Sequence, residues 1–337
     1  MRLGLVLDVV QKGDKRIYAD EAMPFLRFGV ERAEIYAINP EDHKYMNGTV
    51  RAHHINSDQD LELNPLELNG VYFGNLGQSM EEKDTSLTKT LPELCGLFEK
   101  LQQYRSQGLS LINSPETMLN FVSKRYLIKM SQNTDIPFIE SEEVESLDHL
   151  IELSRRDRLM LVKPLISERS NGTIVLNGKT EEELKAHYDR YCKSKTQELN
   201  ESLYAKVMAE QGLIAQPYTS DFADKGEVKI GIMGGKITLS RIHTLGESQD
   251  DVPIVAWGRK DTIVNIAPYS PTTEETALAL RIYDIVNEQF PIHNMRVDLA
   301  GGKVSEIEAL NPSYSINRFN SKAVEEHHRK IIAGFKN

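Results

Sequence analysis

The sequence predicts an α/β fold in its N-terminal third and an α+β arrangement in the remainder. In roughly the first 115 residues, short apolar strands alternate with helical segments, the pattern of a doubly wound parallel sheet. Further along, two β-hairpins follow one another, each marked by a Gly-Gly pair between strands of alternating polarity. The chain has 337 residues, and at ~150 residues per domain it has room for two or three domains.

Strands and helices alternate in the N-terminal part. Arg2–Val9 is a continuous apolar run, the kind of strand that is buried on both faces of a parallel sheet. The other elements predicted here are a helix at Ala19–Arg32, strands at Ala33–Ile38 and Gly70–Phe73, a helix at Leu91–Gln107 and a strand at Leu109–Ile112. This succession predicts a doubly wound parallel-sheet domain over residues 1–115.

The remainder contains helices, isolated strands and the two hairpins. A helix begins at Ser114-Pro115-Glu116, with Ser as the N-cap and Pro in the first turn, and runs to about Gln132, before a break at Asn133–Pro137. It is followed by strands at Leu159–Leu165, Thr173–Leu176 and Leu213–Tyr218, helices at Thr180–Tyr191 and Thr273–Glu288, an exposed loop at Lys193–Glu201, and hairpins at Glu227–Thr244 and Arg296–Leu310.

Composition and charge narrow the function classes. Forty Lys and Arg against fifty Asp and Glu give a net charge of −10, which disfavours nucleic acid and anionic membrane surfaces as partners. The apolar N-terminal run meets Asp8 too soon for a signal peptide, and no run of ~18 apolar residues predicts a membrane span. Cys95 and Cys192 are expected to be reduced thiols. We therefore expect a cytoplasmic protein.

Side-chain parity predicts a charged face on the first hairpin. A loop with an odd number of residues centred on Gly235 pairs Lys229 with Arg241 and Glu227 with His243. Four titratable groups then share one face, backed by an apolar face on the core. The alternative is a solvated sheet face with cross-strand ion pairs.

The second hairpin places carboxylates together. Glu306 and Glu308 share a face, and Asp298 joins them if the loop again has an odd count; a strict Gly-Gly turn would set Asp298 opposite Ser305. Three such charges cannot all stay ionised without a cation between them, and carboxylate oxygens with substrate phosphates suit Mg²⁺. The alternative is that the three carboxylates face water.

Other chemical signals are weaker. No Walker loop is present, since Gly74-Asn75-Leu76-Gly77 is not followed by Lys-Ser or Lys-Thr. Lys163, at the end of an apolar strand, either meets an anion or extends its ammonium to solvent. No nucleophile motif is found, and the pairs His53-His54 and His327-His328 are expected at the surface.

Several short segments carry a family resemblance by their order along the chain. They are Leu3–Asp8, Asn47-Gly48-Thr49-Val50-Arg51-Ala52-His53, Asn113-Ser114-Pro115 followed by Lys124, Val162-Lys163-Pro164-Leu165, Ala215-Gln216-Pro217-Tyr218, Arg241-Ile242, and Asp298 with Glu306-Ile307-Glu308 and Pro312. In this order, over most of the chain, they resemble the ATP-grasp superfamily and, within it, bacterial glutathione synthetase.

The resemblance implies a domain organisation and a nucleotide site. Residues 1–115 would form a Rossmann-like substrate domain, 116–205 the small or lid subdomain, and 206–337 the C-terminal metal- and nucleotide-binding subdomain, the last two being α+β. Lys124 and Lys163 would contact the phosphates of ATP. The adenine edge would be held by backbone groups of Ala215, Gln216, Pro217 and Tyr218.

The resemblance also implies the catalytic groups. Asp298, Glu306 and Glu308 would hold two Mg²⁺ ions, with Mn²⁺ as a substitute, that bridge the phosphates. Arg241 would stabilise the transferring phosphoryl group, and Lys163 would offset its charge.

Two loops depart from the family pattern. The lid loop, Gly-rich in the family, here reads Ile166–Gly172 with one glycine, so Arg169 replaces backbone contacts or closure is impaired. Leu245–Asp251 carries acid where family members bind phosphate or an anionic substrate. Glu308 stands where the family has Asn. These changes favour an amino acid or peptide other than γ-glutamylcysteine and glycine, with Lys229, Asn317 and Arg318 as candidates for binding substrate carboxylates.

The sequence thus predicts an ATP-dependent carboxylate–amine ligase that forms an amide through an acyl phosphate, acting on small molecules. The alternative is a non-catalytic nucleotide-binding regulatory or scaffold protein, favoured by the lost lid glycines. A dinucleotide-binding oxidoreductase is excluded because no Gly-x-Gly-x-x-Gly follows the first strand. A homo-oligomer is compatible with the family.

Overall fold

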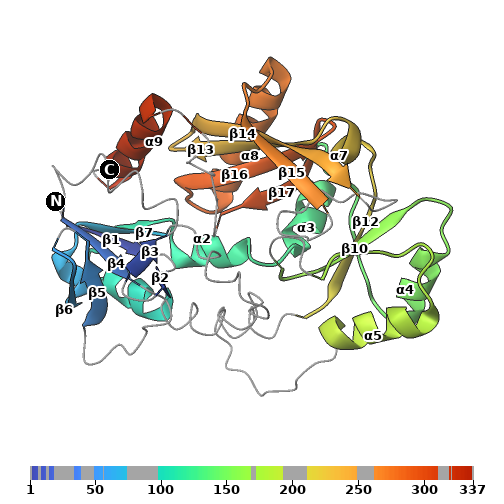
Figure 1. Ribbon diagram of the computed structural model, residues 1–337, viewed down its shortest axis with the longest axis horizontal. Helices are drawn as coiled ribbons and strands as arrows, with labels where there is room; N and C mark the ends of the chain where they lie inside the picture. The colour runs from blue at the N-terminus through green and yellow to red at the C-terminus, as the bar shows by residue number, and fades with distance from the viewer. Residues whose placement is uncertain are drawn as a thin grey trace.

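A computed structural model describes residues 2–6, 9–12, 15–18, 34–38, 49–55, 57–73, 98–167, 172–192, 211–248, 262–309, 319 and 321–335. Its strands form a six-stranded, a four-stranded and a five-stranded sheet and a two-stranded hairpin. In Figure 1 the six-stranded and four-stranded sheets lie at opposite ends of the molecule, and the five-stranded sheet lies above and between them. Within these residues, no helix is both long enough and apolar enough to cross a lipid bilayer.

The six-stranded sheet belongs to the N-terminal part. Its order is β6-β5-β4-β1-β7-β8, with β1 at Arg2–Val6, β4 at Glu34–Ile38, β5 at Val50–His54, β6 at Gln59–Leu63, β7 at Gly70–Phe73 and β8 at Leu111–Ile112. β4, β1, β7 and β8 are parallel, as predicted. The prediction is wrong for β5 and β6, which join the sheet as an antiparallel hairpin.

The β5–β6 hairpin is not predicted from the sequence because β6 is mostly polar. Along Gln59–Leu63 only Leu63 is buried. The first predicted strand is also too long: β1 ends at Val6, and Val9–Lys12 forms β2, which pairs with β3 at Lys15–Tyr18. Residues 98–105 of one predicted helix are helical, whereas the helix predicted at 19–32 lies outside the described residues.

The helix predicted from Ser114 to about Gln132 is in fact two helices. α2 (Pro115–Asn120) begins as expected, because the Ser114 hydroxyl accepts a hydrogen bond from the Thr117 N–H at 3.1 Å. α3 (Arg125–Asn133) follows a break at which the Lys124 N–H donates to the Leu165 carbonyl at 2.9 Å. The single-helix prediction is wrong because the backbone here bonds to another element.

The four-stranded sheet is antiparallel, in the order β11-β10-β12-β9. Its strands are β9 (Glu142–Glu143), β10 (Met160–Pro164), β11 (Ile174–Val175) and β12 (Leu213–Pro217). Its core is shared with α4 (Leu147–Ser154) and α5 (Glu181–Cys192) through residues such as Leu150, Val162 and Leu184. β12 lies beyond the subdomain boundary predicted at residue 205 but pairs with β10.

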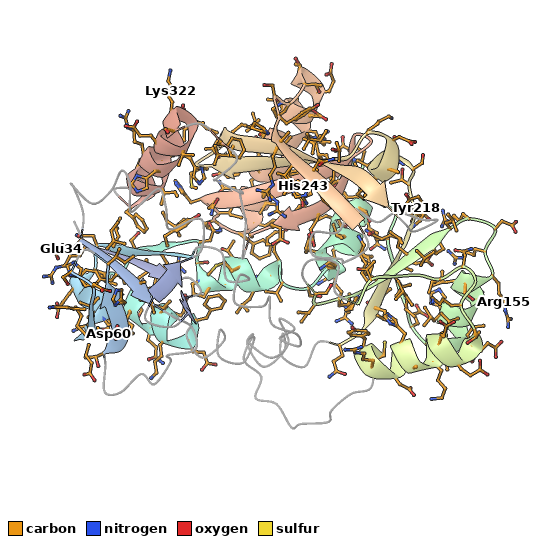
Figure 2. The ribbon with its side chains drawn as sticks, in the orientation of Figure 1. Glu34, Asp60, Arg155, Tyr218, His243 and Lys322 are labelled. Carbon is orange, nitrogen blue, oxygen red and sulfur yellow. The ribbon has the colours of Figure 1, made fainter. Side chains whose placement is uncertain are left out.

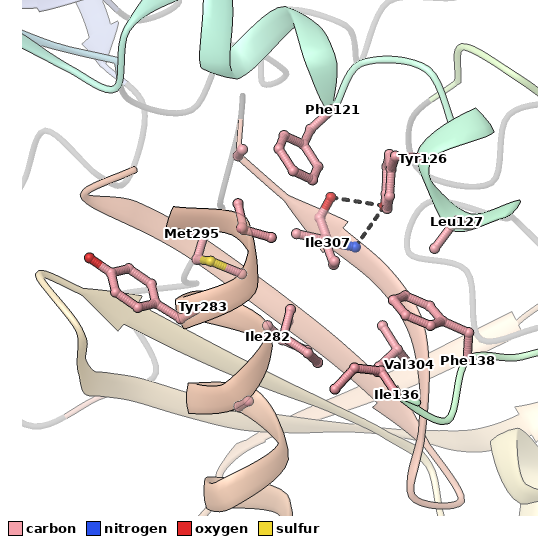
Figure 3. Packing of buried hydrophobic residues seen from close by; sticks show 14 of the residues in the cluster. Phe121, Tyr126, Leu127, Ile136, Phe138, Ile282, Tyr283, Met295, Val304 and Ile307 are labelled. Atoms are coloured by element: carbon pink, nitrogen blue, oxygen red, sulfur yellow. Dashed lines mark hydrogen bonds between the residues drawn. The ribbon is translucent and has the colours of Figure 1, made fainter. Parts of the chain in front are cut away.

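The five-stranded sheet is antiparallel, in the order β15-β14-β13-β16-β17. Its strands are β13 (Glu227–Met233), β14 (Lys236–Ser248), β15 (Thr262–Pro268), β16 (Asn294–Ala300) and β17 (Lys303–Glu308); α7 (Asp221–Asp224) precedes them and α8 (Thr273–Gln289) lies between β15 and β16. The apolar cluster of this sheet contains Met295 and Ile307, packed with Ile282 of α8 and Phe121 after α2 (Figure 3).

The C-terminal helix α9 (Ser321–Gly334) packs against β13 and β14. It contributes His327 and His328, which are only 1% and 2% exposed, so the prediction of surface histidines is wrong here. Val324 of the same helix packs against Leu239 of β14. His53 is buried as well, with Nδ1 3.0 Å from Asp60.

Candidate functional site

The register of the first hairpin brings the predicted residues together. Glu227 pairs with His243 and Lys229 with Arg241, as predicted. The reason differs from the predicted one, since Met233 pairs with Lys236 and the turn is a two-residue Gly-Gly turn. A β-bulge beyond Ile230 supplies the extra residue that an odd loop was expected to provide.

The second hairpin also combines a two-residue turn with a β-bulge. Ala300 pairs with Lys303 across a two-residue turn, and a register shift after Asp298 then sets Asp298 opposite Glu306. The extra residue is Ser305, whose hydroxyl donates to Glu227 Oε1 at 2.8 Å. The bulge therefore decides that Glu306 faces the site and not the core.

Four predicted residues form one row across the sheet. Arg241 of β14, Lys229 of β13, Asp298 of β16 and Glu306 of β17 are successive cross-strand neighbours. In the next row, Arg296 of β16 lies opposite Glu308 of β17. All residues of β13 and β16 are buried, so the alternative of a solvated face is wrong for these strands.

Asp298 is the centre of this polar face. It is fully buried, and its two oxygens accept hydrogen bonds from Arg296 Nε at 2.7 Å and Arg296 Nη2 at 2.9 Å. Lys229 Nζ forms a further hydrogen bond to Oδ2. Burial alone would raise the pKa of Asp298, but Arg296 and Lys229 outweigh it and hold this pKa well below its usual range.

Glu306 lies beside the lysines of the predicted phosphate site. Lys124 Nζ is 3.3 Å from Glu306 Oε1 and donates to the Ser167 carbonyl at 2.7 Å, so it connects β17 to the segment after β10. Burial would raise the pKa of Glu306, but Lys124 and Lys163 bring it below its usual value. Burial lowers the pKa of the Lys163 ammonium, an effect that Glu306 partly offsets.

A buried tyrosine anchors the start of α3. The Tyr126 hydroxyl donates to the Ile307 carbonyl at 2.9 Å and accepts from the Ile307 N–H at 2.7 Å (Figure 3). Burial, and then the negative charge of Glu306, raise the pKa of Tyr126 well above its usual value. Since Ile307 follows Glu306 and Tyr126 lies two residues after Lys124, this contact holds the start of α3 against β17, where Lys124 reaches Glu306.

Arg241 is oriented by its neighbour on the same strand face. Its Nε donates to His243 Nε2 at 2.9 Å, and both residues are buried. Burial, together with the charges of Lys229 and Arg241, lowers the pKa of His243 to about 2. The imidazole is therefore neutral and carries its proton on Nδ1. His243 lies on β14 of the five-stranded sheet and is labelled in Figure 2.

The predicted adenine-binding segment connects two sheets. Ala215, Gln216 and Pro217 end β12, and Tyr218 follows at the point where the chain leaves for α7 and the five-stranded sheet (Figure 2). The Gln216 side chain is buried and donates to Ser141 Oγ at 2.8 Å. The Gln216 side chain is therefore engaged within the protein, and residues 213–217 pair with β10.

The fit to a metal differs among the three predicted carboxylates. In the described part of the chain, no three His, Cys, Asp or Glu side chains are arranged so that they could hold a metal ion. Glu306, 27% exposed, and the partly buried Glu308 offer carboxylate oxygens of the kind that Mg²⁺ takes together with substrate phosphates. Asp298 is directed at Arg296 and Lys229 instead.

Several predicted site residues lie outside the described residues, and two residues of the site were not predicted. Asn317, Arg318, Pro312, residues 168–171 of the lid loop and residues 249–251 lie outside the described residues. Sequence analysis missed Arg296 as a partner of Asp298, although strand parity puts residues 296 and 298 on one face. It also missed Ser167, for which the sequence carries no signal.

Known proteins match this chain by three-dimensional structure and not by sequence. No protein-family model and no curated protein matches the sequence. Solved structures match over the whole chain. D-cycloserine synthetase DcsG has a TM-score of 0.66 at 15% identity, covering 99% of this chain and 100% of that one.

Two further structures agree. ATP-grasp ligase PsnB, complexed with a minimal precursor, has a TM-score of 0.61 at 13% identity, with 98% of each chain covered. D-alanine–D-alanine ligase from Bacillus anthracis has a TM-score of 0.54 at 14% identity, covering 99% of this chain and 97% of that one. With the sheets and the polar face described above, these likenesses establish that the chain has the ATP-grasp fold.

Proposed function

We propose that this protein is an ATP-dependent carboxylate–amine ligase. ATP would transfer its terminal phosphoryl group to the carboxylate of one substrate, and the amine of a second would displace phosphate to form an amide. The observation that carries this proposal is the cross-strand row Arg241, Lys229, Asp298 and Glu306, with Lys124 beside it, in a chain of ATP-grasp fold.

Each group has a role that follows from its charge. Lys124 and Lys163 would bind nucleotide phosphates, and residues 215–218 would hold the adenine edge. Glu306 and Glu308 would hold Mg²⁺, which supplies positive charge against the phosphates when bound. Arg241, held by His243, would stabilise the transferring phosphoryl group. Fixed charges in a water-poor site act without reorganising, so no side-chain nucleophile is required.

The substrates belong to the class of amino acids or short peptides. The structural neighbours include a D-alanine–D-alanine ligase, and PsnB structures complexed with precursor peptides. γ-Glutamylcysteine with glycine, the pair implied by the glutathione synthetase resemblance, is one candidate pair. Asn317 and Arg318 remain candidates for binding a substrate carboxylate, whereas the contacts of Lys229 favour a different role.

The test is release of ADP and phosphate from Mg-ATP in the presence of amino acids and dipeptides, singly and in pairs. Formation of ADP that requires one acid and one amine would establish the ligase and name its substrates. Binding of Mg-ATP, measured by calorimetry, without stimulation by any pair would instead indicate a nucleotide-binding scaffold. Absence of nucleotide binding would contradict both functions.

Replacement of Lys163 tests the nucleotide site itself. Lys163→Met removes a charge that faces Glu306 at the predicted phosphate site, and we expect ATP affinity to fall at least tenfold, about 1.4 kcal/mol. Lys236→Met, at an exposed position on β14, is the matched control and should leave affinity unchanged. Equal affinity of the two variants for ATP would remove Lys163 from the site.

A further inference from the structure

The bonding of Asp298 leaves little room for a metal. An ionised carboxylate offers about four lone-pair sites. In Asp298, two of them receive Arg296 Nε and Nη2, at 2.7 and 2.9 Å, and a third receives Lys229 Nζ. Two full positive charges therefore already lie against a carboxylate that is completely buried.

Lys229 is fixed from its other side as well. Its Nζ is 2.6 Å from Glu227 Oε2, and Glu227 Oε1 accepts from Ser305 Oγ at 2.8 Å. The Lys229 and Glu227 side chains are only 10% and 11% exposed. Lys229 and Arg296 thus offset the charges of Glu227 and Asp298 in the buried part of the site, and Arg296 also lies opposite Glu308.

A Mg²⁺ ion bound by Asp298 would have to enter this set. Mg²⁺ requires six oxygen ligands in near-octahedral geometry and keeps several waters. It would displace Lys229 or Arg296 from the carboxylate, and the displaced cation would remain buried without its partner. Glu306 and Glu308 lie on the edge strand β17 and are partly exposed, with Lys124 Nζ 3.3 Å from Glu306 Oε1 and Arg296 opposite Glu308.

We propose that the Lys229 ammonium takes the place of a second metal ion, so that this site binds one Mg²⁺, through Glu306 and Glu308. The inference rests on the proposed function, because it concerns the same nucleotide site. It assigns Lys229 to charge balance within the protein and not to a substrate carboxylate, and it makes Asp298 the anchor of Lys229 and Arg296.

The test counts Mn²⁺ ions on the full chain saturated with a non-hydrolysable ATP analogue. Electron paramagnetic resonance measures the free Mn²⁺ signal, and calorimetry measures binding of the analogue separately. We expect one Mn²⁺ per nucleotide-bound chain and no spin coupling between ions, whereas two ions ~3.5–4 Å apart would couple. Two coupled ions in the unmodified protein would overturn the inference and leave the proposed function intact.

Lys229→Met supplies the second measurement. It leaves the buried carboxylates of Glu227 and Asp298 short of one positive charge, and we expect bound Mn²⁺ to rise from one to two per chain. Lys303→Met, an exposed position at the turn of the β16–β17 hairpin, is the control and should stay at one. A Lys229→Met chain that folds and still binds one ion would also overturn the inference. Failure of the unmodified chain to bind the analogue would contradict the proposed function instead.

Discussion

His243 contributes to the site by orienting the side chain of Arg241. Its Nε2 is the acceptor for Arg241 Nε, and with a pKa lowered to about 2 by burial it stays neutral across the physiological range. A protonated imidazole would have no lone pair to offer and would repel the guanidinium. The residue therefore positions Arg241 and does not itself transfer protons at neutral pH.

Replacement of this acceptor should slow the reaction without unfolding the protein. We expect His243→Phe to lower kcat for ADP formation about 10- to 100-fold, since a hydrogen bond to a charged group contributes ~1.5–3 kcal/mol. His243→Gln keeps an acceptor oxygen and should recover part of the rate. The measurement is kcat and KM for ATP with the substrate pair found in the screen. A role in packing alone predicts that the Phe variant matches or exceeds the Gln variant.

At the scale of an element, α9 carries two buried histidines whose effect on stability depends on pH. Burial first, and then His328 and Lys330, lower the pKa of His327 to about 3; burial lowers that of His328 to about 4. In the unfolded chain both return to ~6.5. Below that value the unfolded state binds more protons than the folded state, so stability falls as the pH drops from 7 toward 4.

The loss of stability on acidification can be measured for each histidine. Each of these histidines should contribute about 2 kcal/mol to the stability lost between pH 7 and pH 5. Urea unfolding of His327→Gln at both pH values should show an acid-induced loss that is smaller than in the unmodified protein by roughly that amount. An unchanged loss would mean that α9 releases His327 to solvent before the chain unfolds.

At the scale of the whole molecule, one buried asparagine joins the six-stranded and five-stranded sheets. Asn113, just after β8, donates from Nδ2 to the carbonyls of Asn294 and Ala309, at 2.6 and 3.0 Å. Its Oδ1 accepts from the N–H groups of His293 and Asn294, each at 2.9 Å. Asn294 in turn donates from Nδ2 to the Tyr72 hydroxyl of β7 at 3.1 Å.

A second contact joins the same sheets through α9. Phe335, just after the helix, lies against Gly70 of β7, where an added Cβ would meet its ring at 2.2 Å. A Cβ at position 70 would therefore require the Phe335 ring to move. In Figure 1, α9 lies beside the six-stranded sheet and the strands of the five-stranded sheet.

Loss of the Asn113 contacts should destabilise the whole fold. We expect Asn113→Ala to lower the free energy of unfolding by about 3 kcal/mol, because buried backbone groups would lose their partners. Asn133→Ala, at an exposed helix end where the side chain donates to the Lys129 carbonyl of its own helix, should change it by less than ~0.5 kcal/mol. Similar urea midpoints for the two variants would show that the sheets are held together elsewhere.

The sequence by itself determined the strands, the two hairpins and the parity of their side chains. A period of two and a Gly-Gly pair are local properties, so the residue pattern alone placed Glu306 and Glu308 on one face, whereas the pairing of Lys229 with Arg241 and of Asp298 with Glu306 depended on a loop count that the β-bulges supply. The β5–β6 hairpin and the break before α3 could not be predicted in this way, because β6 has a mostly polar surface and Lys124 bonds to a distant carbonyl.

Only the tertiary structure decided how the charges on that face are paired. The bulge at Ser305 sets Glu306 opposite Asp298, and it depends on the meeting of strands and not on the turn residues. Arg296 and Lys229 then reach Asp298, while Lys124 reaches Glu306 and Ser167. Composition gives the charges of a chain, but burial makes each charge depend on its nearest partners, and several of these, such as Lys229 for Asp298 and Lys124 for Glu306, come from other parts of the chain.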